Sequence, residues 1–167
     1  NTGKAGVVVP HGVLFRGAAE RKIRTQTLQE DIIEAVIGLP SNLFFGTSIP
    51  AAIVIFNKQK VNKEKVLFID ASKGFVPGKN QNVLGEKHIQ HITAIFTQFH
   101  DEIMETGIIE ERFAYVASLA EIQENDFNLN IPRYVDTFEA EEEIDLQAVM
   151  QEIKSLEAKR DELDKEI

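Results

Sequence analysis

The sequence of 167 residues contains no cysteine, which excludes disulfide bonds, a thiolate nucleophile and a thiolate zinc site. It also has no apolar run that approaches the roughly 20 residues of a membrane-spanning helix. Basic residues are fewer than acidic ones, 18 against 27, so the formal net charge is −9. Because phosphate binding requires a basic surface, the chain by itself is not expected to wrap DNA, but an acidic part of a larger DNA-binding assembly remains open.

Several sequence patterns with known chemistry are absent as well. There is no phosphate-binding P-loop, no GxSxG nucleophile elbow and no HxE…CxxC pattern of a zinc deaminase. His88 and His91 lie three residues apart in an expected helix, and His100 follows, but no cysteine or suitable carboxylate completes a set of metal ligands. We therefore expect no metal site. The composition, 43% hydrophobic and 27% charged, is that of an ordinary globular protein.

Most of the information lies in residues 6–58. Three apolar runs there, residues 6–10, residues 32–39 and Ala51–Asn57, are each bounded by glycine or proline, and a charge-rich segment with helical spacing separates the first two. This order of strand, helix, strand and strand is typical of an α/β sheet with a site at the strand ends. The loops PHGVLFRG and LPSNLFFGTSIPA are too apolar and too rich in phenylalanine for ordinary solvated turns. We interpret them as the lining of a site.

The periodicity of the chain predicts its elements in more detail. Lys4–Pro10 is expected to be a parallel strand buried on both faces, because its valines run without alternation. Residues 18–30 are expected to form an amphipathic helix with Ile23 and Leu28 inward. Ser118 followed by Glu121 has the pattern of a capping box, with Ser118 as the N-cap of a short helix. The other expected elements are strands at residues 32–39, Ala51–Asn57, Lys65–Asp70 and residues 113–117, a loop at residues 71–83, an extended segment at residues 128–135, and a helix at residues 86–103 with Ile89, Ile92, Phe96, Phe99 and Ile103 spaced at threes and fours.

Four blocks of the sequence resemble one protein family. Residues 7–17 and 36–58 look like the second half of the catalytic domain of DNA adenine methyltransferases from type I restriction systems, and the likeness continues in KVLFIDASKGF at residues 65–75 and ENDFNLNIPRYVD at residues 124–136. The resemblance implies an α/β fold for residues 1–137, made of the later strands of a Rossmann-like methyltransferase sheet with flanking helices. It also implies a parent enzyme, cytoplasmic in a bacterium or archaeon, that transfers methyl from S-adenosylmethionine to N6 of a flipped adenine.

The resemblance further implies that this chain has no catalytic residue of its own. In the family the methyl donor lies over a glycine motif of the FxGxG type, and an NPPF or NPPY tetrapeptide holds the amino group of adenine. Neither string occurs in this sequence, and both lie upstream in the family's order. Because the chain begins without methionine and enters a strand almost at once, we expect a part of a longer protein that is inactive alone. A closely related interpretation is that the parent protein is a fused restriction enzyme–methyltransferase of the same class.

The wall of the target-base pocket is the site that the resemblance assigns to this chain. In related enzymes an aromatic residue after the sixth strand packs against the flipped base. The matching position is Phe44 or Phe45, and Gly46 and Thr47 let the backbone come close. The alternative is that both phenylalanines belong to the core, as most phenylalanines in α/β proteins do.

Two further groups lie close to this candidate site. One, a loop on the pocket or cofactor side at the carboxyl end of the first strand, consists of Pro10, His11 and Gly12. Its histidine either contacts substrate or donor, or is a hydrogen-bonded structural residue. The other group is a basic cluster made of Arg16, Arg21, Lys22 and Arg24. It either contacts phosphates or is a solvated helix face.

Beyond an acidic run at residues 139–143, the sequence changes to a heptad pattern, and we place a second unit at residues 138–167. The seam rows contain Leu146, Val149, Ile153, Leu156, Leu163 and Ile167, with Arg160 as the one charged member. In type I complexes the corresponding helices bundle with the DNA-specificity subunit, and the full complex adds a restriction subunit and double-stranded DNA. The resemblance therefore implies a coiled-coil-like docking helix. Packing back on the chain's own domain and self-dimerisation remain alternatives.

An interpretation from another functional class also fits the sequence. The chain can be a non-enzymatic α/β interaction module that assembles a complex through its carboxyl-terminal helix. The two interpretations differ in whether residues 44–47 serve the methylation reaction.

Overall fold

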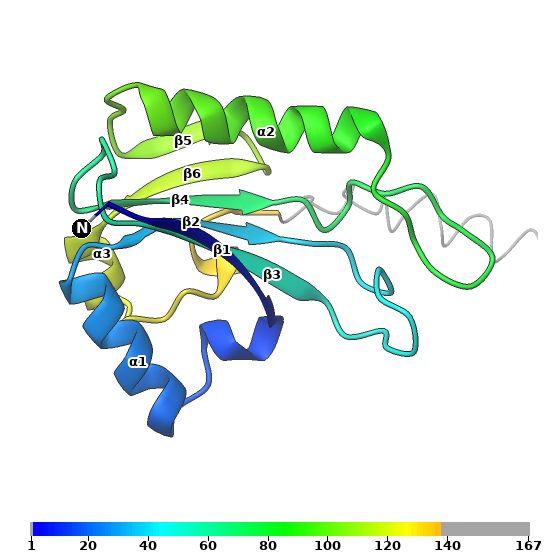
Figure 1. The fold of residues 1–167 in the computed structure, drawn as a ribbon, viewed down its shortest axis with the longest axis horizontal. Coiled ribbons are helices and arrows are strands. Elements are labelled where there is room, and N and C mark those ends of the chain that lie inside the picture. Colours follow the sequence, from blue (N-terminus) through cyan, green and yellow to red (C-terminus); the bar gives the residue numbers. More distant parts are fainter. Residues whose placement is uncertain (1, 138–167) are drawn as a thin grey trace, which may run out of the picture. The chain divides into compact units, whose positions relative to one another are not determined.

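The computed structural model describes residues 2–137, and these form one mixed α/β unit (Figure 1). The predicted acidic boundary at residues 139–143 and the heptad helix lie outside the described residues and stay predictions. Six strands form one sheet in the order β1-β3-β2-β4-β6-β5. The strands are β1 (Lys4–Pro10), β2 (Ile33–Gly38), β3 (Ala51–Asn57), β4 (Lys65–Asp70), β5 (Gly107–Glu110) and β6 (Ala114–Ser118). The α-helices are α1 (Ala18–Gln29), α2 (Glu86–Asp101) and α3 (Leu119–Glu124), and short 3-10 turns cover His11–Leu14 and Ile131–Arg133.

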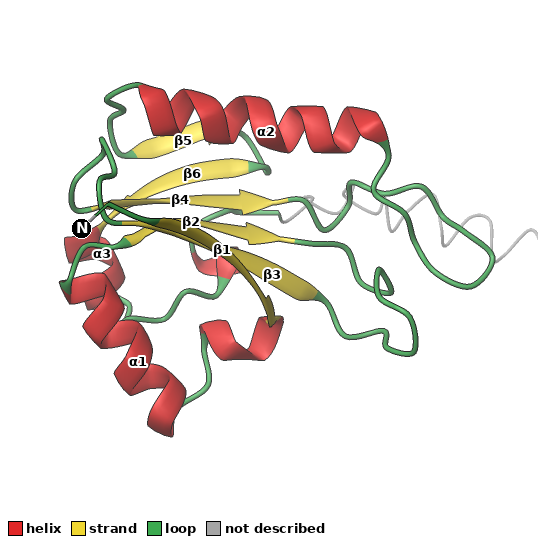
Figure 2. Ribbon diagram, in the orientation of Figure 1, coloured by secondary structure: helices red, strands yellow, loops and turns green. Residues whose placement is uncertain are grey.

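The sheet is covered on both faces, with α2 on one side and α1 and α3 on the other (Figure 2). Strand side chains alternate between two cores. Val36 and Phe68 point into the core beneath α1 and α3, whereas Ile37 and Ile69 point into the core beneath α2. Phe68 also stacks on Tyr134 with ring centroids 4.0 Å apart. Because both faces are covered, all six residues of β2 are buried, which explains the continuous apolar run in the sequence.

Strand pairing corrects the prediction for β1. The strand pairs antiparallel to β3 and lies at the edge of the described sheet. Val7 and Val8 are 42% and 54% exposed, so this strand is not buried on both faces. A run of valines indicates β-structure but carries no information on which strands flank it or in which direction they run. Only β2 and β4 are parallel among the described strands.

The inward face of α1 differs from the predicted one. Leu28 is buried, but Ile23 is 63% exposed and Arg24 is buried in its place. The Arg24 guanidinium donates to the carbonyls of Val13 and Phe127, at 2.7 and 3.3 Å. A charged side chain can be buried when such partners satisfy it. Arg24 is therefore a structural residue rather than part of a solvated basic surface.

The predicted bounds of β3 and β4 are confirmed, and the predicted strand at residues 113–117 is confirmed one residue later. The helix predicted for residues 86–103 ends at Asp101, and Ile89 and Ile103 are 45% and 81% exposed rather than inward. Strand β5 was not predicted, since a strand of four residues that begins with a glycine gives little periodicity. The segment at residues 128–135 is not wholly extended, because it contains the turn Ile131–Arg133.

The buried side chain of Asn62 caps the carboxyl end of α2. Asn62 is 2% exposed, and its side-chain amide donates to the carbonyls of Phe99 and Glu102 while its oxygen accepts from the backbone N–H of Met104 at 2.7 Å. These bonds satisfy backbone groups that the end of a helix leaves without intrahelical partners.

We expect Asn62→Ala to lower the free energy of unfolding by about 2–4 kcal/mol, because buried backbone groups lose their partners. Urea denaturation of the chain measures this loss. Asn62→Asp should lose at least as much, because it keeps the acceptor for Met104 but sets a carboxylate oxygen against the buried carbonyls of Phe99 and Glu102. A loss under about 0.5 kcal/mol for Asn62→Ala would contradict the capping role.

The predicted N-cap of α3 is confirmed, because the Ser118 hydroxyl accepts from the backbone N–H of Glu121 at 3.1 Å. Ser118→Ala should therefore destabilise the chain by about 1 kcal/mol in the same urea assay, whereas Ser118→Asp should keep most of the stability. Equal stability of the alanine variant and the parent chain would show that the cap contributes nothing.

Candidate functional site

The loop between β2 and β3, residues 39–50, forms the centre of the site. It leaves the sheet at the carboxyl end of β2, where Leu39 donates its backbone N–H to Ala51 at 2.9 Å. Asn42 and Gly46 both have positive φ angles, 54° and 78°. Asparagine and glycine are the residues that adopt this conformation most readily. These two residues permit tight turns on either side of Phe44, which lines a pocket with residues of β1 and β3.

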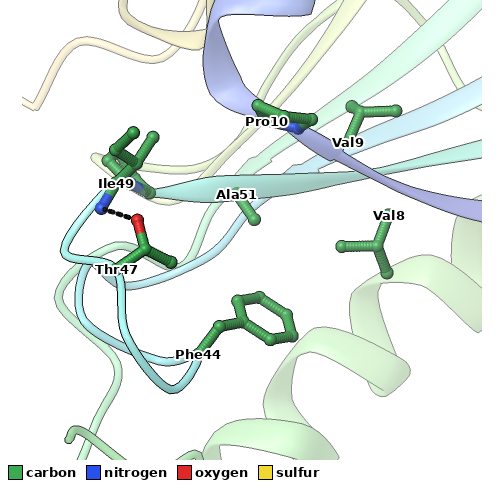
Figure 3. A pocket seen from close by; sticks show the side chains of 8 residues that line it. Val8, Val9, Pro10, Phe44, Thr47, Ile49 and Ala51 are labelled. Atoms are coloured by element: carbon green, nitrogen blue, oxygen red, sulfur yellow. Dashed lines mark hydrogen bonds between the residues drawn. The ribbon is translucent and has the colours of Figure 1, made fainter.

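An apolar pocket of about 250 Å³ lies between this loop and β1 (Figure 3). Its lining residues come from β1, the loop and the start of β3: Val8, Val9, Pro10, Phe44, Thr47, Ile49, Pro50 and Ala51. The ring of Phe44 is turned into the pocket, opposite Val8. Phe44 is 43% exposed, whereas Phe45 is 91% exposed and does not line the pocket. Neither phenylalanine belongs to the core formed by residues 2–137, so the alternative of two core phenylalanines is wrong for the described part of the chain.

The chemistry of the pocket is almost entirely apolar. The Thr47 hydroxyl is the one polar side-chain group in the lining, and it already accepts from the backbone N–H of Ile49 at 3.1 Å. A slot with aliphatic walls and one aromatic face suits a flat ring, because stacking on an aromatic side chain contributes about 1–3 kcal/mol per nucleic-acid base. Such walls favour an aromatic group by its shape. They offer few hydrogen-bonding partners to the edge of a base and so distinguish poorly between bases.

The three residues predicted at the carboxyl end of β1 differ in their position relative to the pocket. Pro10 lines the pocket, whereas His11 and Gly12 do not. The backbone N–H of His11 donates to Pro50 at 3.0 Å, and the His11 ring lies edge-on to Phe15. Burial lowers the pKa of His11, an effect that the nearby Asp70 carboxylate opposes. The main chain of His11 thus fixes the start of the turn against β3.

The basic cluster does not form a single surface. Arg24 is buried, as described above, and Arg21 pairs with Asp126. The guanidinium of Arg16 lies over Gly12, where an added Cβ would come within 2.8 Å of its Nε atom. Lys22 is exposed. A continuous phosphate-binding face is therefore not formed by these four residues.

A second loop, residues 71–85, lies against the first and was not predicted to be part of the site. Its side chains and backbone donate to three carbonyl groups of the loop at residues 39–50, the aromatic loop: those of Ser41, Asn42 and Leu43. The donors are Gln81 and Asn82, which lie in the polar run Lys79-Asn80-Gln81-Asn82. A run of amide side chains is also common in turns that contact nothing, so the sequence offered no clear signal for this contact.

Within residues 2–137 no group of three His, Asp or Glu side chains has the arrangement of a metal site. His91 pairs with Glu110 at 2.8 Å and His100 pairs with Glu34 at 2.7 Å. No helix in the same residues is long and apolar enough to cross a membrane.

Comparison with known proteins identifies the family. A family model described as N-6 DNA Methylase matches residues 1–143. The MjaVII methylase subunit of a type I restriction enzyme from Methanocaldococcus jannaschii is 39% identical over 165 residues, which cover 96% of this chain and 27% of that protein. The MpnII methylase subunit from Mycoplasma pneumoniae is 32% identical over 96% of this chain and 28% of its own length. This chain thus spans little more than a quarter of these relatives.

Solved structures agree with the sequence comparison. The methyltransferase subunit of a type I restriction–modification system from Streptococcus thermophilus superimposes with a TM-score of 0.72 at 51% identity, over 81% of this chain and 27% of that one. The EcoKI M protein shares the fold, with a TM-score of 0.62 at 20% identity, over 78% of this chain and 34% of that one. Since the family model covers most of the sequence and the structures share its mixed α/β fold, the chain belongs to the N-6 DNA methylase family.

Proposed function

We propose that this chain is part of a DNA adenine N6-methyltransferase of the type I restriction–modification class, in which it forms one wall of the pocket for a flipped adenine. The observation that carries the proposal is the apolar pocket with the half-exposed ring of Phe44 turned into it. A base swung out of a duplex loses its stacking, and an aromatic face restores part of that energy.

The described sheet is proposed to be the later part of a larger Rossmann-like sheet. Strand β1 supports this proposal, because it lies at the edge of the described sheet with Val7 and Val8 exposed. The relatives are also about four times longer than the matched region, which is 27% of the MjaVII subunit. An exposed apolar edge strand is a ready partner for a further strand.

The methyl donor of the parent enzyme is proposed to be S-adenosylmethionine, which supplies the transferred methyl group when it is bound. The residues around the pocket do not fit this donor by themselves. Its ammonium, carboxylate and ribose hydroxyl groups require polar partners, and the lining offers one threonine hydroxyl that is already engaged. We therefore assign no methyl-transfer step to side chains of this chain, and its proposed contribution is to receive and orient the base.

The partners of the parent enzyme are proposed from the family and from the sequence of residues 146–167. A structure described as showing complex assembly and conformational transition of a type I system shares the fold of this chain, with a TM-score of 0.61 at 15% identity. We propose that the heptad residues Leu146 to Ile167 dock on a DNA-specificity subunit, and that a restriction subunit and double-stranded DNA join through the complex.

Phe44→Ala in the full-length methylase subunit, assembled with its partners, should lower kcat/KM for DNA methylation by about 5- to 150-fold, the equivalent of 1–3 kcal/mol of lost stacking. Radiolabelled methyl incorporation measures the rate. Phe45→Ala is the matched control and should stay within about twofold of the parent, because that ring does not line the pocket.

Loss of activity in Phe45→Ala with Phe44→Ala intact would contradict the assignment of the pocket. If both variants methylate normally and removal of residues 138–167 abolishes binding of the specificity subunit, the interaction-module alternative holds for this chain.

The chain of 167 residues alone is expected to transfer no methyl group to DNA, because neither an FxGxG motif nor an NPPF-type tetrapeptide occurs in it. Incubation with labelled S-adenosylmethionine and host DNA that lacks the modification tests this expectation, with the full-length subunit complex as the positive control. Incorporation above the no-protein background would show that the chain has catalytic groups of its own.

A further inference from the structure

The second loop contains a small closed hairpin, residues 76–83, next to the aromatic loop. Val76 and Val83 exchange both backbone hydrogen bonds, at 2.8 and 3.0 Å, and close its neck. At Gly78 an added Cβ would lie 2.3 Å from the carbonyl oxygen of Gln81, so a side chain is excluded there. The hairpin therefore has a defined shape of its own and presents its tip in a fixed direction.

The second arm of this hairpin, next to its neck, holds the main chain that precedes Phe44. The backbone N–H of Asn82 donates to the carbonyl of Asn42 at 2.8 Å, and the Asn82 side-chain amide donates to Ser41 at 2.9 Å. The Gln81 amide donates to Leu43 at 3.2 Å. A return contact from the Asn42 side chain to the Asn80 carbonyl is longer, at 3.5 Å. Three consecutive carbonyl groups, the last directly before Phe44, thus receive hydrogen bonds from one turn.

Few other contacts order this part of the aromatic loop. Leu43 packs partly against the core beneath α2, but Ser41 and the residues from Phe44 to Gly46 are exposed. Fixing the backbone of one exposed residue costs about 1–2 kcal/mol of conformational entropy. Hydrogen bonds that order the loop before a ligand arrives remove that cost from the binding step.

We infer that Gln81 and Asn82 are positioning residues, which hold the aromatic loop so that the ring of Phe44 is in place before the target base enters the pocket. This inference rests on the proposed function of Phe44. The side chains of Gln81 and Asn82 act through the main chain of residues 41–43 and are not assigned a contact with DNA. Their removal should weaken capture of the flipped base without changing the binding of the duplex, which depends chiefly on phosphate contacts elsewhere in the complex.

The test first requires the target sequence, which is determined by mapping methylated adenines in host DNA. It then uses the full-length subunit complex and a duplex that carries 2-aminopurine in place of the target adenine. The fluorescence of 2-aminopurine rises when it leaves the base stack and so reports flipping, while anisotropy at fixed salt reports duplex binding. The double variant Gln81→Ala/Asn82→Ala should lower the flipping equilibrium constant by about tenfold, the effect of two lost hydrogen bonds, with duplex Kd within about twofold.

Asn80→Ala is the matched control. It removes the same kind of side chain from the same turn, and within the described residues the Asn80 side chain makes no hydrogen bond, since only its carbonyl accepts one. Flipping and Kd should match the parent. The conservative variant Asn82→Gln, which keeps an amide donor, should recover part of the flipping that Asn82→Ala loses.

A double-mutant cycle with Phe44→Ala separates this inference from the proposed function. If Gln81 and Asn82 act through Phe44, the double variant should add no further loss in the Phe44→Ala background. Normal flipping in Gln81→Ala/Asn82→Ala overturns the positioning role while Phe44 remains assigned. Equal losses of flipping and duplex affinity, or an equal loss in Asn80→Ala, overturn it in favour of a general structural role. Normal flipping in Phe44→Ala overturns the proposed function itself.

Discussion

The parallel pairing of β2 with β4 is the constraint on which the rest of the structure depends. Gly38 lies opposite Asp70 in this pair, so both strands end at the same edge of the sheet, and Ala71 donates its backbone N–H to Gly38 at 3.0 Å. The aromatic loop leaves from the end of β2, and the loop that contacts it leaves from the end of β4. Two segments some 40 residues apart, as in the contact between Asn82 and Ser41, therefore meet without any long connection.

The opposite ends of the strands contain buried polar groups that hold the layers together. Glu34 is fully buried, and its Oε1 atom accepts from Asn57 on β3 at 3.1 Å and pairs with His100 on α2 at 2.7 Å. Lys60, which is 3% exposed, donates to the carbonyls of Ile33 and Lys65 and pairs with Asp31. Buried charges of this kind are costly unless they are paired and hydrogen-bonded. These buried polar contacts lie at the end of the strands away from the apolar pocket.

Much of this fold could be predicted from local patterns, because the central strands are apolar runs bounded by turn residues. The bounds of β3 and β4 and the cap at Ser118 follow from such patterns. The burial of the Arg24 side chain could not be predicted, since one of its hydrogen-bond acceptors, the carbonyl of Phe127, lies 103 residues away in the sequence. Similarly, the run of valines in β1 gave no indication that the strand lies at an edge.

The prediction for the candidate site named a pair of residues, of which Phe44 lines the apolar pocket. The family resemblance pointed to Phe44 or Phe45, and only the turn around Gly46 distinguishes the ring in the pocket from the ring in solvent. The contribution of Gln81 and Asn82 was not visible, because asparagine and glutamine in a loop are also common in turns that contact nothing. Their meaning depends on the strand pairing that brings the two loops together.

The most direct measurement of the central claim is a structure of the full-length subunit complex bound to a duplex that contains its target site. Our account predicts that the target adenine lies outside the helix, with its ring in van der Waals contact with Phe44 at about 3.5–4 Å, and that Phe45 faces away from the base. An adenine that remains stacked in the duplex, or that is held against other residues with Phe44 distant from it, would contradict the account.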